Sequence, residues 1–131
     1  MAPDALVEEW KEAGRLFRDE FRKQYPVKAC FWLKQSDDDR WYLYVASEEI
    51  NESNKRKAYT EVQRSAKRIK GAYLDRFRIN LIHTDDPLVQ GVLDIQSRYP
   101  GPMGTYYSGS RLGGQDIDGL YIYPAAATVP D

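Results

Sequence analysis

The stretch Val27–Ser47, VKACFWLKQSDDDRWYLYVAS, decides the fold that this sequence predicts. Two runs rich in aromatic and apolar residues, 27–34 and 41–47, lie on either side of a polar segment with three consecutive aspartates. Runs of this kind favour β-strands, and aspartate favours turns. We therefore predict a β-hairpin here, and the rest of the chain is assigned outward from it.

Helical periodicity flanks the hairpin on both sides. Residues 4–24 predict an amphipathic helix that ends before Pro26, because apolar residues recur there at spacings of three and four. These are Leu6, Trp10, Ala13, Phe17 and Phe21. After the hairpin the same period returns over 52–71, and Gly71 suits a C-terminal stop.

The remaining chain predicts a strand, a helix and a last strand. RINLIHT (78–84) favours a strand, and Asp86-Pro87 is typical of a helix start with Asp86 as the cap. LYIY (120–123) predicts the last strand, whereas the six glycines and two prolines of 100–119 predict an irregular connection. The order α-β-β-α-β-α-β predicts an α+β fold. We expect one two-layer domain over 1–124, built on a small mixed or antiparallel sheet with helices on one or both faces, and a C-terminal tail at 125–131.

Length and composition narrow the class of protein. A chain of 131 residues fits one domain, and 42% hydrophobic residues exclude a wholly disordered chain. A single cysteine, Cys30, excludes an internal disulfide and a multi-cysteine zinc site. No apolar run approaches the roughly 20 residues of a membrane span, and the N-terminus lacks the pattern of a secretory signal. We expect a soluble cytoplasmic protein without a membrane partner.

Charge is unevenly distributed although the net charge is only −1. Residues 52–78 hold nine basic and three acidic residues, whereas 83–131 hold two basic and six acidic ones. On the predicted helix, Lys57, Arg64 and Arg68 share one strip. It is flanked by Lys55, Arg56, Lys67 and Lys70. Such a strip is most often solvated, but it can also dock on an acidic protein, or bind nucleic acid through Lys57, Arg64, Lys67 and Arg68.

The stretch YSGSRLGGQDIDGLYIY (107–123) resembles the signature of the nucleotidyltransferase superfamily. The resemblance implies that Gly109 and Ser110 face a triphosphate, and that Asp116 and Asp118 coordinate Mg²⁺. The sequence departs from that pattern, because only five residues separate Ser110 from Asp116 and no further carboxylate follows before Asp131. We therefore expect a glycine-rich connection with solvated aspartates, and we keep the nucleotide and Mg²⁺ site as an alternative.

Two further groups carry weaker chemical signals. His83, Asp85 and Asp86 cluster at a predicted strand end, where we expect a strand-end histidine and a helix cap rather than a metal site. Cys30 lies among apolar residues in a predicted strand, which favours a buried, inert thiol over a nucleophile with His83 as its base. No catalytic group or cofactor is therefore assigned.

Strand alternation predicts an aromatic face on the sheet. Alternate positions of the strands gather five side chains that we assign to protein binding. They are Trp32, Tyr42, Tyr44, Tyr121 and Tyr123. We expect core residues if a helix covers this face, and a platform for a partner if it is open. We predict a non-enzymatic interaction module that binds a protein partner or a second copy of itself. The alternatives are nucleic-acid binding through helix 55–70 and the nucleotide site at 109–118.

Overall fold

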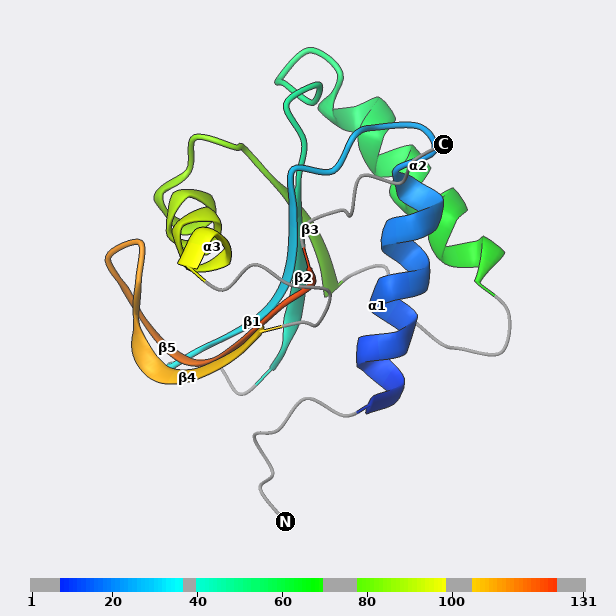
Figure 1. Cartoon of the computed structure of the whole chain (residues 1–131). Coiled ribbons are helices and arrows are strands. Elements are labelled where there is room, and N and C mark those ends of the chain that lie inside the picture. Colours follow the sequence, from blue (N-terminus) through cyan, green and yellow to red (C-terminus); the bar gives the residue numbers. More distant parts are fainter. Residues whose placement is uncertain (1–7, 37–39, 70–77, 99–104, 125–131) are drawn as a thin grey trace.

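A five-stranded mixed sheet lies at the centre of the structure, in the strand order β3-β2-β1-β5-β4 (Figure 1). The computed structural model describes residues 8–36, 40–69, 78–98 and 105–124. The strands are β1 (Ala29–Gln35), β2 (Tyr42–Ala46), β3 (Ile79–Ile82), β4 (Thr105–Leu112) and β5 (Gln115–Ile122). The helices are α1 (Glu8–Phe21), α2 (Lys55–Arg68) and α3 (Pro87–Arg98).

The predicted hairpin is confirmed as the antiparallel pair β1–β2. Its register places Phe31 opposite Tyr44 and Trp32 opposite Leu43. On its outer side β2 pairs with β3 in parallel, across the α2 crossover, whereas β1–β5 and β4–β5 are antiparallel. The order of elements is the predicted one with a single additional strand, β4.

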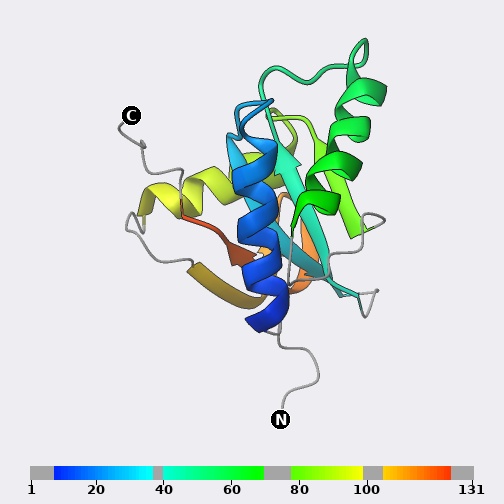
Figure 2. The ribbon, with the colours of Figure 1, turned by 90° about the vertical axis from the view of Figure 1, so that its right-hand side faces the viewer.

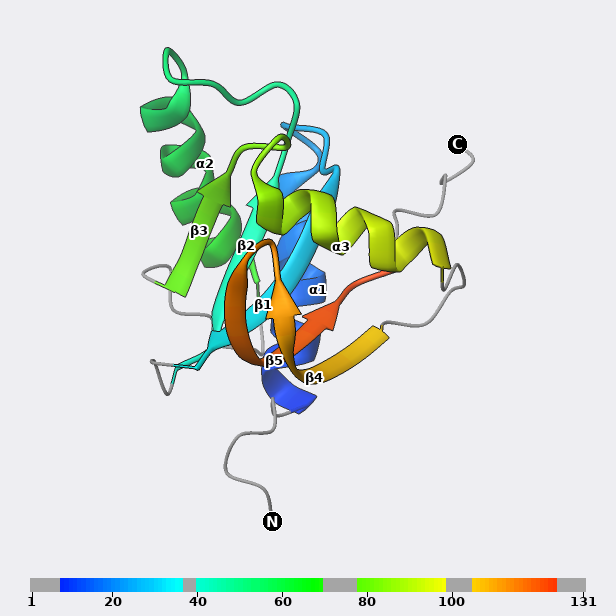
Figure 3. The ribbon, with the colours of Figure 1, turned by 90° about the vertical axis from the view of Figure 1, so that its left-hand side faces the viewer.

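Helices cover both faces of this sheet, so the α+β domain has three layers rather than the two predicted (Figures 1 and 2). Helices α1 and α2 lie on one face, over a core that includes Phe17, Trp32 and Val62. Helix α3 lies on the other face, over a core that includes Leu33, Val92 and Leu120 (Figure 3). The expected core is therefore divided into two clusters by the sheet.

The irregular connection predicted for 100–119 is wrong over its described part, 105–119. Strands β4 and β5 form a hairpin there, with Leu112 opposite Gln115. The turn between them is Gly113-Gly114, and both glycines have a positive φ (58° and 84°). Positive φ at both central residues defines the tight turn that matches the twist of two strands, and glycine adopts it without strain.

The boundaries of the elements differ modestly from those predicted. Helix α1 occupies 8–21 of the predicted 4–24, and α2 occupies 55–68 of the predicted 52–71. The last strand begins at Gln115 rather than at residue 120. Residues 1–7 and the expected tail 125–131 lie outside the described residues, as do Lys70 and Gly71.

Candidate functional site

The five aromatic residues assigned to protein binding do not share one face of the sheet. Trp32 lies opposite Leu43 in the β1–β2 register and opposite Tyr121 in the β1–β5 register, so it faces α1 with Tyr121. Tyr44 lies opposite Phe31, and its ring stacks on the Phe31 ring at 5.4 Å on the face that α3 covers. Tyr42 has the same parity as Tyr44 along β2. The aromatic set is therefore split between the two faces.

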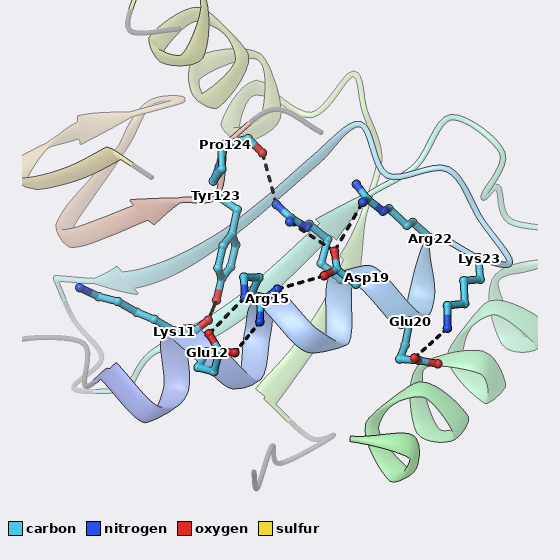
Figure 4. Close-up of polar contacts among 10 residues, drawn as sticks. Lys11, Glu12, Arg15, Asp19, Glu20, Arg22, Lys23, Tyr123 and Pro124 are labelled. Atoms are coloured by element: carbon cyan, nitrogen blue, oxygen red, sulfur yellow. Dashed lines mark hydrogen bonds and ion pairs between the residues drawn. The ribbon is translucent and has the colours of Figure 1, made fainter. Parts of the chain in front are cut away.

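Two members of the set are buried, because α1 covers them. Trp32 is 1% exposed and Tyr123 is 3% exposed. The Trp32 indole N–H donates to the Tyr123 hydroxyl oxygen at 2.8 Å. That hydroxyl donates to the Lys11 carbonyl oxygen at 2.6 Å (Figure 4). Burial raises the pKa of Tyr123 well above its usual range. These two side chains fix α1 to the sheet and are not available to a partner.

Gly14 of α1 explains how the helix approaches so closely. A Cβ at this position would overlap the Tyr123 hydroxyl and would lie 2.8 Å from the Trp32 indole nitrogen. Only glycine leaves room for the Trp32–Tyr123 hydrogen bond beneath the helix. The contact is a packing device between α1 and the sheet, and it closes the face that could have been an aromatic platform.

The remaining aromatic residues are half-buried. The Lys11 ammonium lies 5.0 Å from the centre of the Tyr121 ring, which packs edge-on against Tyr123 at 5.1 Å. Tyr42 and Tyr44 are also half-buried, on the opposite face. None of the five presents a flat, fully exposed ring to a base or to a partner.

The Gly-Ser-Asp stretch forms strands rather than a phosphate-binding turn. Gly109 and Ser110 lie within β4, and the glycine turn is the later pair Gly113-Gly114. Asp116 forms an ion pair with Arg111 at 3.1 Å. The resemblance to the nucleotidyltransferase signature therefore does not extend to the local geometry, which is a β-hairpin.

The second aspartate of that stretch also has partners. The Asp118 carboxylate lies 3.0 Å from the buried Lys34 ammonium and accepts the Ser36 hydroxyl at 3.2 Å. The Lys34 ammonium, with help from Ser36, holds the pKa of Asp118 below its usual range. Within the described part of the chain, no three His, Cys, Asp or Glu side chains gather as a metal site.

His83 and Asp86 occupy the places that the sequence predicts at the end of β3. The Asp86 side chain accepts the Leu88 N–H at 2.9 Å, which confirms it as the cap of α3. The His83 ring lies 3.3 Å from the Glu52 carboxylate, on an exposed surface. A small hollow that is open to solvent lies beside it. It is lined by Ile50, Asn51, Lys55, Leu81, Ile82 and His83.

Cys30 is buried in the core beneath α1, as expected for a structural thiol. It is 3% exposed, and burial raises its pKa to about 12. A thiolate is the reactive form of cysteine, so this environment makes Cys30 a poor nucleophile. Since His83 instead pairs with Glu52 at the exposed end of β3, the two residues do not form a catalytic pair.

The exposed side of α2 carries a group of basic side chains that form no ion pair with a described acidic residue. Arg56, Lys57, Arg64 and Lys67 are all exposed, and no described acidic side chain pairs with any of them. We call these four residues the basic face of α2. At 100° per residue they fall within an arc of roughly 120°, and they span roughly 16 Å along the axis. Thr60 and Gln63 lie exposed between them.

Arg68, which the sequence also predicts on this strip, is arranged differently. Its guanidinium lies 3.0 Å from Glu61 and 3.7 Å from Glu20. Glu61 is 7% exposed and also accepts the buried Ser65 hydroxyl at 2.9 Å. Arg68 is therefore neutralised and helps to hold α2 against α1. Arg56, expected only to flank the strip, takes its place because its angle coincides with that of Lys67.

Comparison with known proteins gives no match at any level. No family model, curated protein or solved structure matches the chain. Among the described helices, none has both the length and the apolar character needed to cross a membrane.

Proposed function

We propose that this domain is a non-enzymatic interaction module whose binding surface is the basic face of α2. The partner is a protein with an acidic surface. The observation that carries the proposal is the set of four exposed cations, Arg56, Lys57, Arg64 and Lys67, none of which forms an ion pair with a described acidic residue. The proposal keeps the cytoplasmic location that the sequence predicts.

The electrostatics of the basic face suit an intermolecular contact. Cations already paired within a protein must give up that pairing before they can bind elsewhere, whereas unpaired ones lose only water. Long-range attraction between complementary surfaces accelerates association and selects against partners of like charge. Arginine also makes two parallel hydrogen bonds to a carboxylate, so Arg56 and Arg64 can orient an acidic partner.

A nucleic acid is the second candidate partner, because Lys57 and Arg64 lie two helical turns apart on an unobstructed surface. Two observations favour a protein. The net charge of −1 gives no overall attraction to a polyanion, and the segment before α2 carries the exposed acids Glu48, Glu49 and Glu52. The acidic residues of this segment would repel a long phosphate backbone, whereas a compact acidic patch can contact the basic face without approaching them.

The proposal is tested by reversing the charge of the basic face. Arg64→Glu with Lys67→Glu is compared with Lys28→Glu plus Arg98→Glu, which changes the net charge equally on exposed positions elsewhere. Each tagged protein is used to capture partners from a lysate of its own organism, with and without nuclease. We expect a stoichiometric protein that the wild type and the Lys28/Arg98 variant retain and the α2 variant loses.

The same experiment separates the two candidate partners. A protein retained after nuclease treatment, and lost only on α2 reversal, agrees with the proposal. Recovery that collapses with nuclease in the wild type would transfer the assignment to nucleic acid. If reversal on α2 and reversal elsewhere weaken capture equally, the basic face is not the binding surface.

A further inference from the structure

Strand β4 ends the sheet on the side opposite β3, and its outer edge faces away from the other described strands. Its inner edge pairs with β5 from Thr105 to Leu112. No described strand pairs with the outer edge. In an antiparallel ladder alternate residues point their N–H and C=O groups away from the partner strand, so about half of these eight residues present such groups outward.

The sequence of β4 lacks the residues that usually protect an edge strand from pairing with another chain. Such strands are commonly short, or carry lysine, proline or inward-pointing charges. The β4 sequence TYYSGSRL has no proline, lysine, aspartate or glutamate. Its single charge, Arg111, pairs with Asp116 and donates to the Gly114 carbonyl oxygen at 2.8 Å. By contrast, the other edge strand, β3, has only four residues.

We propose that β4 pairs antiparallel with β4 of a second copy of this chain, about a twofold axis, so that two sheets form one continuous ten-stranded sheet. A twofold axis is the commonest symmetry of soluble dimers, and antiparallel pairing of a strand with itself satisfies it directly. With the axis near the middle of β4, the two Arg111 residues lie at opposite ends of the new ladder. Each then faces uncharged positions of the first half of the strand, and no like charges oppose.

The dimer leaves the proposed binding surface free and is independent of it. Helix α2 crosses over beside β3, at the end of the sheet opposite β4 (Figure 3). Each dimer would therefore carry two basic faces at its outer ends. If a partner carries two acidic patches, two linked basic faces bind it more tightly than one face does, without any new kind of contact.

The test uses Arg111, because hairpin geometry fixes the direction of its backbone. Leu112 and Gln115 close the two-residue turn and face each other, so the N–H of the neighbouring Arg111 points to the outer edge. Arg111→Pro removes this donor and places a ring in the path of a second strand, while leaving the β4–β5 bonds intact. Arg111→Ala is the matched control, since it also loses the Asp116 ion pair but keeps the N–H.

Sedimentation velocity over a range of concentrations gives the readout. We expect a concentration-dependent dimer for the wild type and for Arg111→Ala. Arg111→Pro should weaken association at least about tenfold, because each dimer loses two outward hydrogen bonds. A wild type that stays monomeric throughout, or an Arg111→Pro variant that dimerises like the control, overturns the proposal.

Hydrogen exchange provides a second measurement that needs no variant, in case Arg111→Pro does not fold. The Arg111 amide of the wild-type protein should exchange more slowly as the protein concentration rises, because the dimer covers it. An Arg111 amide whose exchange does not depend on concentration contradicts pairing through β4, even if a dimer forms by another surface.

Discussion

Helices α1 and α2 have the same length, fourteen residues, and lie side by side on one face of the sheet, yet they use their charges in opposite ways (Figures 1 and 2). On α1 the charges pair locally, and Lys11 pairs with Glu8. Arg15 pairs with both Glu12 and Asp19 (Figure 4). On α2 the single acid, Glu61, is buried. The charges on the outer surface of α1 thus largely neutralise one another, whereas the four cations of the basic face of α2 pair with no described acidic residue.

The inner sides of the two helices differ as well. Helix α1 buries the large side chains Phe17 and Phe21, whereas α2 buries the smaller Ala58 and Val62 together with the polar pair Glu61 and Ser65. Helix α1 therefore contributes mainly to the core, and α2 contributes mainly to the surface. If the basic face of α2 binds a partner as proposed, stability and binding rest on neighbouring helices.

The largest expected effect concerns the core side of α1. Phe17→Ala removes a fully buried ring, so it should lower the free energy of unfolding by about 3–5 kcal/mol. Val62→Ala on α2 removes less apolar volume and should cost about 2 kcal/mol. Urea denaturation followed by circular dichroism measures both. Equal losses would show that α2 anchors the core as strongly as α1 does, which would break the comparison.

Chemical labelling of Cys30 tests whether α1 opens locally. With its pKa raised to about 12 by burial beneath α1, the native thiol should react with a thiol reagent about a thousandfold more slowly than an exposed cysteine. Labelling near neutral pH, with the urea-unfolded protein as the control, gives the ratio. Fast labelling under native conditions would mean that α1 lifts from the sheet without global unfolding.

Periodicity within each element was predictable from the sequence, but the relation between elements was not. The apolar spacing of α1 and the alternation of β1 are local properties and appear directly in the residues. Whether Trp32 faces Leu43 or Tyr44 depends on the register between β1 and β2, and a slip of one residue exchanges the faces. Alternation alone does not show this register and therefore predicts one aromatic face, whereas Tyr42 and Tyr44 lie on the face opposite to Trp32.

Strand β4 is hidden in the sequence for a different reason. The six glycines in 100–119 together predict an irregular chain, although Gly113-Gly114 alone forms the turn. Two adjacent glycines between β-prone residues are a hairpin signal when only two residues separate the strands. Gly119 lies inside β5 instead, where the Trp41 ring packs at the position that a side chain would fill.

Replacing a basic residue in the first turn of α2 should raise the stability of the fold while it weakens binding of the partner. Lys55, Arg56 and Lys57 lie there without an acidic residue, although the positive end of a helix dipole favours acids. Arg56→Glu should therefore raise the free energy of unfolding by about 0.5–1 kcal/mol and weaken capture of the partner. Arg56→Gln should give a smaller gain, since it removes the unfavourable charge without adding a favourable one. A loss of stability in both variants would show that Arg56 has a structural role instead.

The smallest expected effect concerns the ion pairs within α1. The Arg15 guanidinium donates to the Glu12 carboxylate at 3.1 Å and holds the pKa of Glu12 below its usual range. A carboxyl group with a lower pKa in the folded than in the unfolded protein stabilises the fold above the unfolded pKa. That contribution is lost as the pH falls through the folded pKa.

NMR titration of the Glu12 carboxyl carbon measures this pairing directly. The pKa should return toward its usual range in Arg15→Gln and in high salt, because both weaken the ion pair. Lys67→Gln on α2 is the control and should leave the Glu12 pKa unchanged, since Lys67 pairs with no described acid. A Glu12 pKa in its usual range in the wild type would show that the charges of α1 are as unpaired as those of the basic face of α2. The charge difference between the two helices would then no longer single out α2 as the binding surface.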